Sequence, residues 1–270
     1  MDIFDEGNAV PQVVYEDTSL VAVIKPARMH SVPGVGQGDL CTWAFERYPE
    51  LRNAGAGADG RTRSPGEGGI LHRLDYETSG IVLFARNAGA FASILAQQEK
   101  GGFLKEYSAL SGVSPDFRPE GSDPENGFPS GIDEEAWTDA RDRRDAATLA
   151  ALLDSGAQEN PRVVSSVFRS FGPRGSRVAC IGNIGRTKKV YRSEIRGSLA
   201  SASGLGLRVG LSRGFRHQIR AHLAWIGLPI SGDALYGGAP DGRLRLHALS
   251  LMFSHPATGE AMILSAEGRG

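Results

Sequence analysis

A strand, a helix and a second strand follow one another closely in the first half of the chain, and this succession constrains the fold most. Residues 80–85 form a short, uninterrupted apolar run, which is typical of a buried strand. Asn87 then predicts the start of a helix, and a glycine pair predicts its end. Residues 103–110 alternate in character, so we expect a strand with Lys105 and Tyr107 on one face.

Further segments predict strands and helices around this unit. Residues 13–25 predict two short strands around an Asp-Thr-Ser turn, ended by a proline. Residues 215–226 predict a helix with an apolar stripe, ended by a glycine. Residues 52–69 are rich in Gly, Arg and Ser and predict a loop. Other strands are expected at residues 163–168, 177–181, 190–195 and 205–211, and a surface helix at residues 137–153.

The loop before the first of these buried strands reads His-Arg-Leu-Asp-Tyr-Glu-Thr-Ser-Gly and has Asp75 near its centre. Polar neighbours on both sides and a strand immediately afterwards favour a carboxylate that is solvated and held in one direction. A nucleophile needs such a carboxylate, although the residues alone equally allow a turn-stabilising role. Because only a strand and a helix separate this loop from the next strand, Asp75 and Tyr107 can be neighbours in space.

A second polar cluster occupies residues 213–222. Arg216 and Arg220 are four residues apart, so they share one flank of the expected helix. A guanidinium beside an apolar stripe is partly desolvated and favours a carboxylate partner. If that partner is Asp75, the pairing keeps the carboxylate ionised and fixes its direction. A solvated basic face of the helix explains the same spacing equally well.

Tyr107 and Lys105 are each open to two interpretations. A strand tyrosine usually packs in the core with its hydroxyl at the rim. It can also provide a platform on which a flipped base stacks, with the hydroxyl placed for proton transfer. Lys105 is expected to contact a phosphate or to serve the structure.

The charge of the chain is unevenly distributed. Residues 111–160 contain twelve acidic and four basic residues, a net charge of −8, so the rest of the chain carries +7 against an overall charge of −1. A basic body with an acidic insertion is compatible with a polyanionic substrate, and also with an ordinary enzyme that has a solvated loop. The first part of the insertion, residues 113–135, is crowded with Gly, Pro, Ser and acids, so we expect it to be loosely packed.

Several other functional classes lack support in the sequence. His217 and His222 are five residues apart and do not have the spacing of zinc enzymes, so no metal is expected. Nucleotide-binding glycine patterns and a Gly-x-Ser-x-Gly elbow are also missing. Two distant cysteines, no membrane-length apolar run and an acidic start predict a cytoplasmic protein with reduced thiols.

Four motifs in the same order resemble those of the RluA-type pseudouridine synthases. Together they cover most of the chain outside residues 111–160, and four ordered motifs are more specific than one. They are Val14-Tyr15-Glu16-Asp17 through Lys25-Pro26, His72-Arg73-Leu74-Asp75-x-x-Thr78-Ser79-Gly80, Lys105-x-Tyr107, and the block from His217-Gln218-Ile219-Arg220-x-His222 to Gly232-Asp233-x-x-Tyr236-Gly237.

The resemblance implies a role for each matching residue. Asp75 stands where the family has its catalytic aspartate, Tyr107 where it has the base-stacking tyrosine, and Arg220 where it has the arginine that pairs with the aspartate. Arg73 matches the arginine that helps to evict the target base. Substrate-binding roles are also expected for His72, Lys105, Arg216 and His217. The implied reaction converts a uridine within RNA to pseudouridine without a cofactor, by cleaving the N-glycosidic bond, rotating the uracil and joining its C5 to the ribose.

The chain also departs from the family pattern. Where the family usually has Thr-Gly-Arg-Thr before His-Gln, this chain has Arg-Gly-Phe-Arg, so Phe215 occupies the usual arginine position. Ile24 and Arg28 replace the more usual Asn and Gly around the Lys-Pro pair. These changes, together with the acidic insertion, concern RNA docking more than the chemistry.

We therefore expect an α+β, pseudouridine-synthase-like fold with a mixed, mostly antiparallel central sheet flanked by helices and loops. Residues 1–270 are expected to form a single catalytic domain with an acidic insertion at about residues 111–160 and no N-terminal S4-type RNA-binding module. The expected partner is a structured rRNA or tRNA, and the protein is expected to be a monomer that binds neither metal nor membrane.

Two rival functions remain open at this point. An RNA-binding or RNA-folding factor without activity could keep the same scaffold, and it would tolerate Asp75→Ala. An Asp-dependent N-glycosidase would need a second catalytic carboxylate about 5–10 Å from the first, and no second acid accompanies the motifs.

Overall fold

The computed structural model describes residues 10–34, 38–55, 66–117, 119–123, 127–155, 161–182, 189–201 and 204–266, without the side chains of residues 198–201. The chain divides into two compact units, residues 1–106 with 247–270 and residues 107–246. Strand β4 (Leu104–Ser111) begins in the first unit and ends in the second. Each unit has its own helices and its own buried core.

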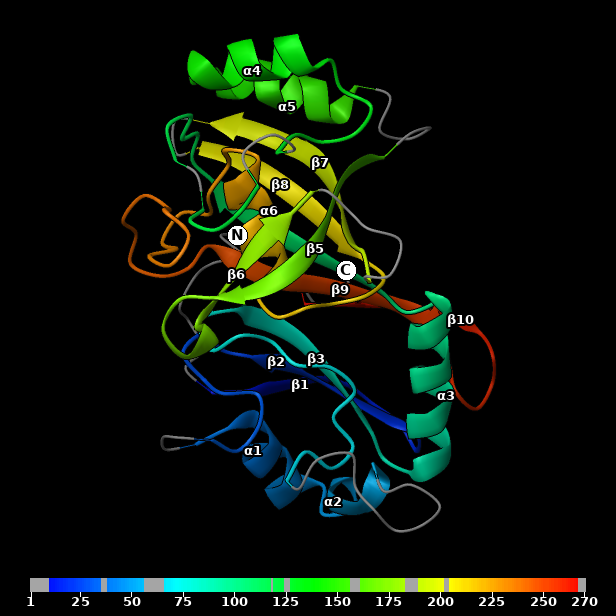
Figure 1. The fold of residues 1–270 in the computed structure, drawn as a ribbon. Helices are drawn as coiled ribbons and strands as arrows, with labels where there is room; N and C mark the ends of the chain where they lie inside the picture. Colours follow the sequence, from blue (N-terminus) through cyan, green and yellow to red (C-terminus); the bar gives the residue numbers. More distant parts are fainter. Residues whose placement is uncertain are drawn as a thin grey trace. The chain divides into compact units, whose positions relative to one another are not determined.

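The first unit is built on five strands, which Figure 1 shows. They follow the order β1-β2-β3-β9-β10, in which only the β3–β9 pair is parallel. The predicted strand pair at residues 13–25 and the buried strand at residues 80–85 are confirmed. The strands are β1 (Gln12–Glu16), β2 (Leu20–Lys25), β3 (Ser79–Ala85), β9 (Leu246–Ser254) and β10 (Ala261–Ser265).

The helices of this unit begin and end at residues with the expected capping chemistry. Helix α3 (Ala88–Lys100) begins where Asn87 accepts a hydrogen bond from the backbone of Ala90, and ends at the left-handed Gly101, as the sequence predicts. Helices α1 (Leu40–Arg47) and α2 (Leu51–Ala54) were not expected. Figure 1 shows them together on one side of strands β1 to β3.

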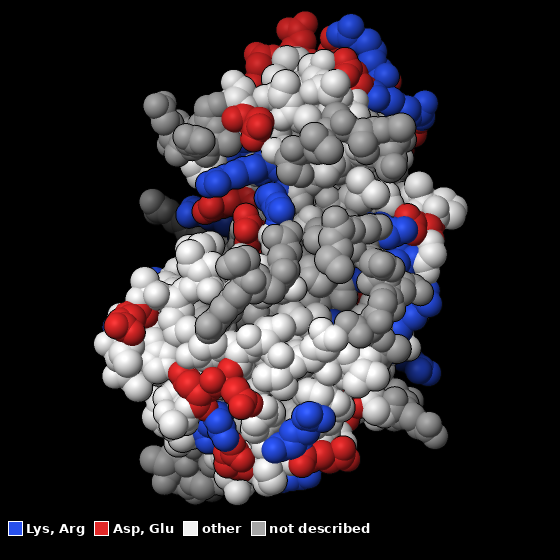
Figure 2. Space-filling view, turned by 180° about the vertical axis from the view of Figure 1, so that it is seen from behind, with Lys and Arg blue, Asp and Glu red and all other residues white. Residues whose placement is uncertain are grey.

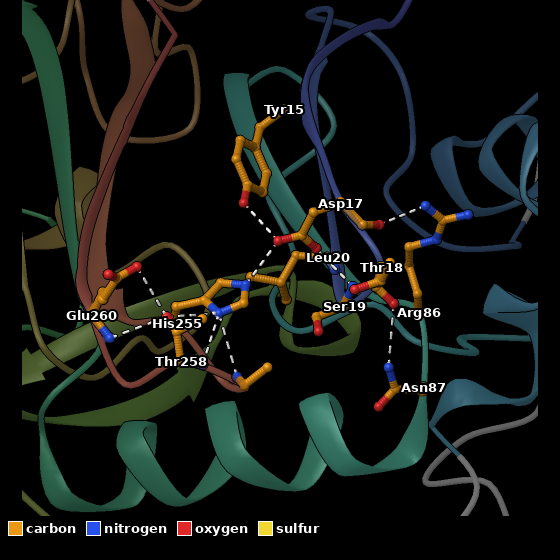
Figure 3. Close-up of polar contacts among 11 residues, drawn as sticks. Tyr15, Asp17, Thr18, Ser19, Leu20, Arg86, Asn87, His255, Thr258 and Glu260 are labelled. Atoms are coloured by element: carbon orange, nitrogen blue, oxygen red, sulfur yellow. Dashed lines mark hydrogen bonds and ion pairs between the residues drawn. The ribbon is translucent and has the colours of Figure 1, made fainter.

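A polar cluster centred on Asp17 ties the first strand pair to the β9–β10 connection (Figure 3). Its carboxylate accepts hydrogen bonds from Tyr15 Oη at 2.6 Å and from the backbone N–H groups of Ser19 and Leu20 at 2.7 Å. His255 Nε2 lies 2.8 Å from the same carboxylate. Partial burial acts to raise the pKa of Asp17, but these hydrogen bonds outweigh burial and hold the pKa below its usual value.

The second unit follows the strand order β4-β8-β7-β5-β6. The β8–β7, β7–β5 and β5–β6 pairs are antiparallel. Along β4 the side chains of Lys105 and Tyr107 are buried while those of Leu104 and Glu106 are more exposed, which confirms the predicted alternation. The other strands, all expected from the sequence, are β5 (Arg162–Phe171), β6 (Arg177–Ile181), β7 (Tyr191–Ser201) and β8 (Gly204–Leu211).

The acidic insertion contains two helices, α4 (Glu134–Asp142) and α5 (Ala146–Asp154), and the single helix predicted at residues 137–153 is wrong. The break has a local cause. Arg144 adopts a left-handed conformation with φ of 54°, and Asp145 then caps α5 by accepting from the backbone of Thr148. Helix α5 packs on β7, where a Cβ on Gly197 would lie 2.6 Å from the carbonyl oxygen of Ala150.

The described part of residues 113–135 makes hydrogen bonds to distant segments, while most of its side chains are half-buried or exposed, so the expectation of loose packing stays a prediction. Asp123 donates its backbone N–H to the carbonyl of Cys180 and accepts from Trp225 Nε1 at 2.6 Å. Ser130 exchanges hydrogen bonds with Val163, and Ser114 donates to the carbonyl of Gly227. The sequence composition missed these contacts because their partners lie far along the chain.

Arginines inside the insertion neutralise part of its negative charge. Arg141 and Arg143 pair with Asp142 and Asp139, and Arg144 pairs with Asp116 at 3.3 Å. On the face shown in Figure 2, small groups of Lys and Arg lie beside groups of Asp and Glu. These arginines are already counted in the net charge of −8, so the charge asymmetry of the sequence remains.

The predicted fold class is confirmed. The described residues contain ten strands and six α-helices, and the sheet is mixed and mostly antiparallel. No helix within the described ranges is long and apolar enough to cross a membrane. The two cysteines are buried and unpaired, Cys41 in the first unit and Cys180 in the second. The expectation of a single catalytic domain stays a prediction.

Candidate active site

The loop that carries Asp75 is held in place from both sides by buried polar groups. Ser31 Oγ donates to the carbonyl oxygen of Leu74 at 2.8 Å and accepts from its N–H at 3.0 Å. On the other side, Lys25 Nζ donates to the carbonyl oxygen of Tyr76 at 3.3 Å. Thr78 N–H donates to the carbonyl oxygen of Asp75 itself at 3.1 Å. The backbone direction at Asp75 is thus fixed one residue before and one residue after it, while its side chain is half-buried.

Lys25 is fully buried, and its ammonium connects this loop to other backbone segments by hydrogen bonds. Besides Tyr76, its ammonium donates to the carbonyl oxygens of Pro26 and Met29, both at 2.8 Å. A buried ammonium is stable when its N–H groups have acceptors. The sequence placed Lys25 in a family motif, but its contact with the Asp75 loop is visible only in the structure.

The strand that follows the loop requires a glycine. Gly80 has φ of +120°, and a Cβ at this position would lie 2.2 Å from the carbonyl oxygen of Ala248 on β9. The preceding Ser79 pairs its hydroxyl with His247 Nδ1 at 2.8 Å. The Thr-Ser-Gly end of the motif therefore joins the Asp75 loop to β9.

His72 and Lys105 lie against Phe103 in the first unit. The His72 ring is 5.8 Å from that of Phe103, and its Nε2 accepts from the backbone N–H of Leu83 at 3.3 Å. Burial, and then the charge of Lys105, lower the pKa of His72 to about 3, so the ring is neutral. Burial also lowers the pKa of Lys105 to about 8, and its ammonium lies 5.7 Å from the Phe103 centroid.

Arg73 is mostly exposed, with 60% of its side chain accessible. Its guanidinium pairs with Glu67 at 2.9 Å. An exposed ion pair of this kind stabilises the fold little, so Arg73 can exchange Glu67 for another anion at small cost.

In the second unit, Arg220 makes a paired contact with Asp233 that the sequence did not predict. Nε donates to Oδ2 at 2.7 Å and Nη2 donates to Oδ1 at 2.8 Å. The two side chains are 7% and 0% exposed. Asp233 Oδ1 also accepts from the backbone N–H groups of Leu235 and Tyr236. Such a two-bond contact fixes the plane of the guanidinium.

Tyr236 extends this cluster to His217. The Arg220 guanidinium lies 5.3 Å from the Tyr236 ring centroid, and Tyr236 Oη accepts from the backbone N–H of Val178 at 2.9 Å. His217 Nδ1 lies 3.1 Å from the same hydroxyl, and its backbone is left-handed with φ of 57° just before α6 (Gln218–Trp225). Burial raises the pKa of Tyr236 to about 12. His217 is therefore held in an uncommon conformation by the cluster around Arg220.

The remaining predicted residues of the second unit are Tyr107 and Arg216. Tyr107 is 7% exposed on β4. Arg216 donates to the carbonyl oxygens of Gly175 and Arg177, so its guanidinium lies over the β5–β6 connection, which includes the 3₁₀ turn Pro173–Gly175.

The predicted residues thus form two groups, one in each unit. Arg220, His217 and Tyr236 are connected in the second unit, and His72 and Lys105 are neighbours in the first. The pairing of Arg220 with Asp75 and the proximity of Asp75 to Tyr107 stay predictions. Sequence reasoning did not identify Ser31, Lys25 or Asp233 as supports of the predicted site, because each acts through a tertiary contact.

Comparison with known proteins defines the class to which this fold and these motifs belong. Human RNA Pseudouridylate Synthase Domain Containing 1 is similar in structure, with a TM-score of 0.58 and 19% identity, over 95% of this chain and 82% of that chain. Human RNA Pseudouridylate Synthase Domain Containing 4 gives a TM-score of 0.55 at 17% identity, over 94% of this chain and 87% of that chain. At these identities the likeness concerns the fold, which is that of the pseudouridine synthases.

Curated sequence relatives point to the same class. Ribosomal large subunit pseudouridine synthase D of Haemophilus influenzae is 26% identical over 277 residues, 96% of this chain and 68% of the relative. An uncharacterized RNA pseudouridine synthase of Chloroflexus aurantiacus is 32% identical over 241 residues, 87% of this chain and 58% of the relative. The chain thus spans about six to seven tenths of these relatives.

The family model for RNA pseudouridylate synthase matches residues 19–225. This match includes the Asp75 loop, β4 and all of α6. The chain belongs to the RNA pseudouridylate synthase family. The predicted reaction class, isomerisation of uridine within RNA, is confirmed.

Proposed function

We propose that this protein isomerises selected uridines of a structured ribosomal or transfer RNA, with Asp75 as the catalytic carboxylate. The observation that carries the proposal is the fixed backbone around Asp75, which Ser31, Lys25 and Thr78 hold on both sides. A rigid support of this kind is what a reacting group requires. The name of the Haemophilus relative, ribosomal large subunit pseudouridine synthase D, favours rRNA among the substrates.

The chemistry needs one ionised carboxylate at the sugar of the target uridine. Asp75 can attack the ribose carbon, or it can remove a ribose proton, and either step releases the uracil from its N-glycosidic bond. The uracil then turns, and its C5 forms a bond to the same ribose carbon. A proton leaves C5 and a proton is gained at the nitrogen that was cleaved, so no cofactor is consumed.

The other predicted residues would support this step. We propose that Tyr107 stacks on the target base and that Arg220 pairs with the Asp75 carboxylate, as the family resemblance implies. Arg220 has five N–H donors, and Asp233 receives two of its hydrogen bonds. Arg73, His72, Lys105, Arg216 and His217 would contact the RNA or position its target. The same proposal includes a cytoplasmic monomer.

Tritium release from 5-tritiated uridine in unmodified rRNA and tRNA tests the proposal. Turnover should release tritium while the base stays attached to the RNA. Asp75→Asn should lower the rate by roughly 100- to 10,000-fold, the range for loss of a group that acts in the transition state. The matched control is Glu77→Gln, in the same loop, whose exposed carboxylate pairs with Arg28, and it should keep the rate within a few-fold.

The rival functions give different results in the same experiment. Free uracil would identify an N-glycosidase. RNA binding without tritium release, unchanged by Asp75→Asn, would identify a factor that only binds or folds RNA. Full activity of the Asp75→Asn variant would contradict the assignment of Asp75.

A further inference from the structure

The second unit contains an aromatic hollow that none of the predicted catalytic residues uses. Its volume is about 440 Å³, within the range of small-molecule sites. We call the rings of Phe168 on β5, Tyr191 on β7 and Phe215 before α6, with the side chains around them, the aromatic hollow. We propose that it binds an unpaired nucleobase of the RNA substrate, away from the uridine that reacts. The inference rests on the proposed function, because it requires an RNA substrate.

The three rings form a platform suited to stacking. Phe168 and Phe215 are stacked, with centroids 5.1 Å apart and planes 11° apart. Tyr191 closes the group, with its centroid 5.6 Å from that of Phe168 and 5.0 Å from that of Phe215. All three residues are half-buried, so each is partly accessible. Unpaired bases bind to proteins by stacking on such rings.

A rigid floor supports the platform from below. The Phe168 ring lies 4.9 Å from that of His222, which is fully buried. Ser166 Oγ and Ser193 Oγ lie 2.9 Å and 2.8 Å from the two ring nitrogens of His222. Burial lowers the pKa of His222 to about 3, so the floor stays neutral at physiological pH. The buried His222 ring thus supports Phe168 from the side opposite to solvent.

The charges at the rim suit a nucleic acid. The described lining contains two cationic side chains, Lys189 and Arg169, and no carboxylate. Lys189 Nζ lies 5.4 Å from the Tyr191 centroid, and both Lys189 and Arg169 are exposed. A phosphodiester next to a stacked base would meet these cations. An apolar peptide would gain nothing from them, so the observations favour RNA over a protein partner.

Phe215 lies at the entrance to α6, three residues before Gln218. A base stacked on its ring would be recognised by its face, while the cations at the rim contact the RNA backbone.

Three substitutions of Phe215 test the inference, with binding measured by fluorescence anisotropy of a labelled single-stranded oligouridylate. Phe215→Tyr keeps the ring and should bind like the wild type. Phe215→Leu keeps apolar volume without a ring face and should weaken binding by roughly 5- to 150-fold, as should Phe215→Ala. Phe171→Ala is the control, because Phe171 lies on the same strand outside the hollow. Melting temperatures confirm that each variant folds.

Crosslinking with the same oligonucleotide containing 4-thiouridine gives a second readout. Crosslinks to peptides with Phe168, Tyr191 or Phe215 support the inference. Equal binding by the Leu and Tyr variants overturns it, since apolar volume alone would then suffice, and so does equal weakening by Phe171→Ala. If the wild type releases tritium and Phe215→Leu binds the oligonucleotide with wild-type affinity, the inference about the hollow is contradicted, but the proposed function stands. If the wild type releases no tritium, the proposed function is contradicted, whatever the binding results for the Phe215 variants.

Discussion

Each unit contains a buried cation that holds part of the predicted site in place, Lys25 in the first unit and Arg220 in the second. Lys25 holds three backbone carbonyls around the Asp75 loop, and Arg220 is held flat against Asp233. Neither cation needs to touch substrate to matter. Removing the partner of a buried charge leaves that charge uncompensated, which costs far more than the loss of an exposed ion pair.

Asp233→Asn should therefore lower the free energy of unfolding by about 3–5 kcal/mol, because the buried Arg220 loses the countercharge of Asp233. The matched control is Asp241→Asn, which breaks the more exposed pair between Asp241 and Arg245 and should cost about 1 kcal/mol or less. Urea denaturation of the three proteins measures both changes. Equal losses in the two variants would show that the Arg220 pair stabilises the fold no more than a surface pair.

Individual elements show which sequence signals predict structure well. The N-cap at Asn87 and the glycine at the end of α3 act locally, and both were predicted to the residue. Alternation along β4 is equally local. Strand β9 was missed because it is buried along nearly its whole length, so it shows no alternation. The single helix predicted in the insertion was wrong because Arg144 and Asp145 break it.

At the β3–β9 junction, Gly80→Ala should be among the most damaging single changes in the chain. The added methyl would meet the Ala248 carbonyl oxygen at 2.2 Å, and φ of +120° is strained for alanine. We expect a loss of more than about 3 kcal/mol, or an insoluble product. Gly112→Ala is the control, since no atom lies within 4 Å of its added methyl. A melting temperature of the Gly80 variant equal to that of the control would refute this account.

For the whole molecule, the family motifs predicted the fold class and the reaction. The structure revealed the contacts that hold the predicted site residues in place. The sequence identified Asp75 and Arg220 by pattern, and it placed Lys25 in a motif without assigning it a role. It did not reveal that Asp233 binds Arg220 or that Ser31 holds Leu74, because those contacts join segments that only folding brings together. The division into two compact units was also not visible in composition, because β4 runs through both without a linker.

Stability should fall with acid in a way that depends on Asp17. The pKa of Asp17 is depressed in the folded protein, so the folded state binds fewer protons than the unfolded chain near the usual aspartate pKa. The ionised Asp17 carboxylate therefore stabilises the fold at pH values above the pKa of Asp17 in the unfolded chain. This stabilisation is lost as the pH falls through the pKa of Asp17 in the folded protein. In urea denaturation from about pH 6 to about pH 2, Asp17→Asn should lower stability at the upper end and flatten the acid slope.

Tyr15→Phe removes one of the hydrogen bonds to the Asp17 carboxylate and should give an intermediate slope. An acid slope identical in the wild type and both variants would mean that other carboxylates control acid unfolding.

Each compact unit contains one buried cysteine, so the two thiols allow the unfolding of each unit to be followed separately. Burial raises the pKa of both cysteines, that of Cys180 to about 12, so neither thiol is reactive while its own unit is folded. The sequence contains no third cysteine. Alkylation followed by peptide mass spectrometry would consequently report the opening of each unit separately, Cys41 for one and Cys180 for the other, without any engineered label.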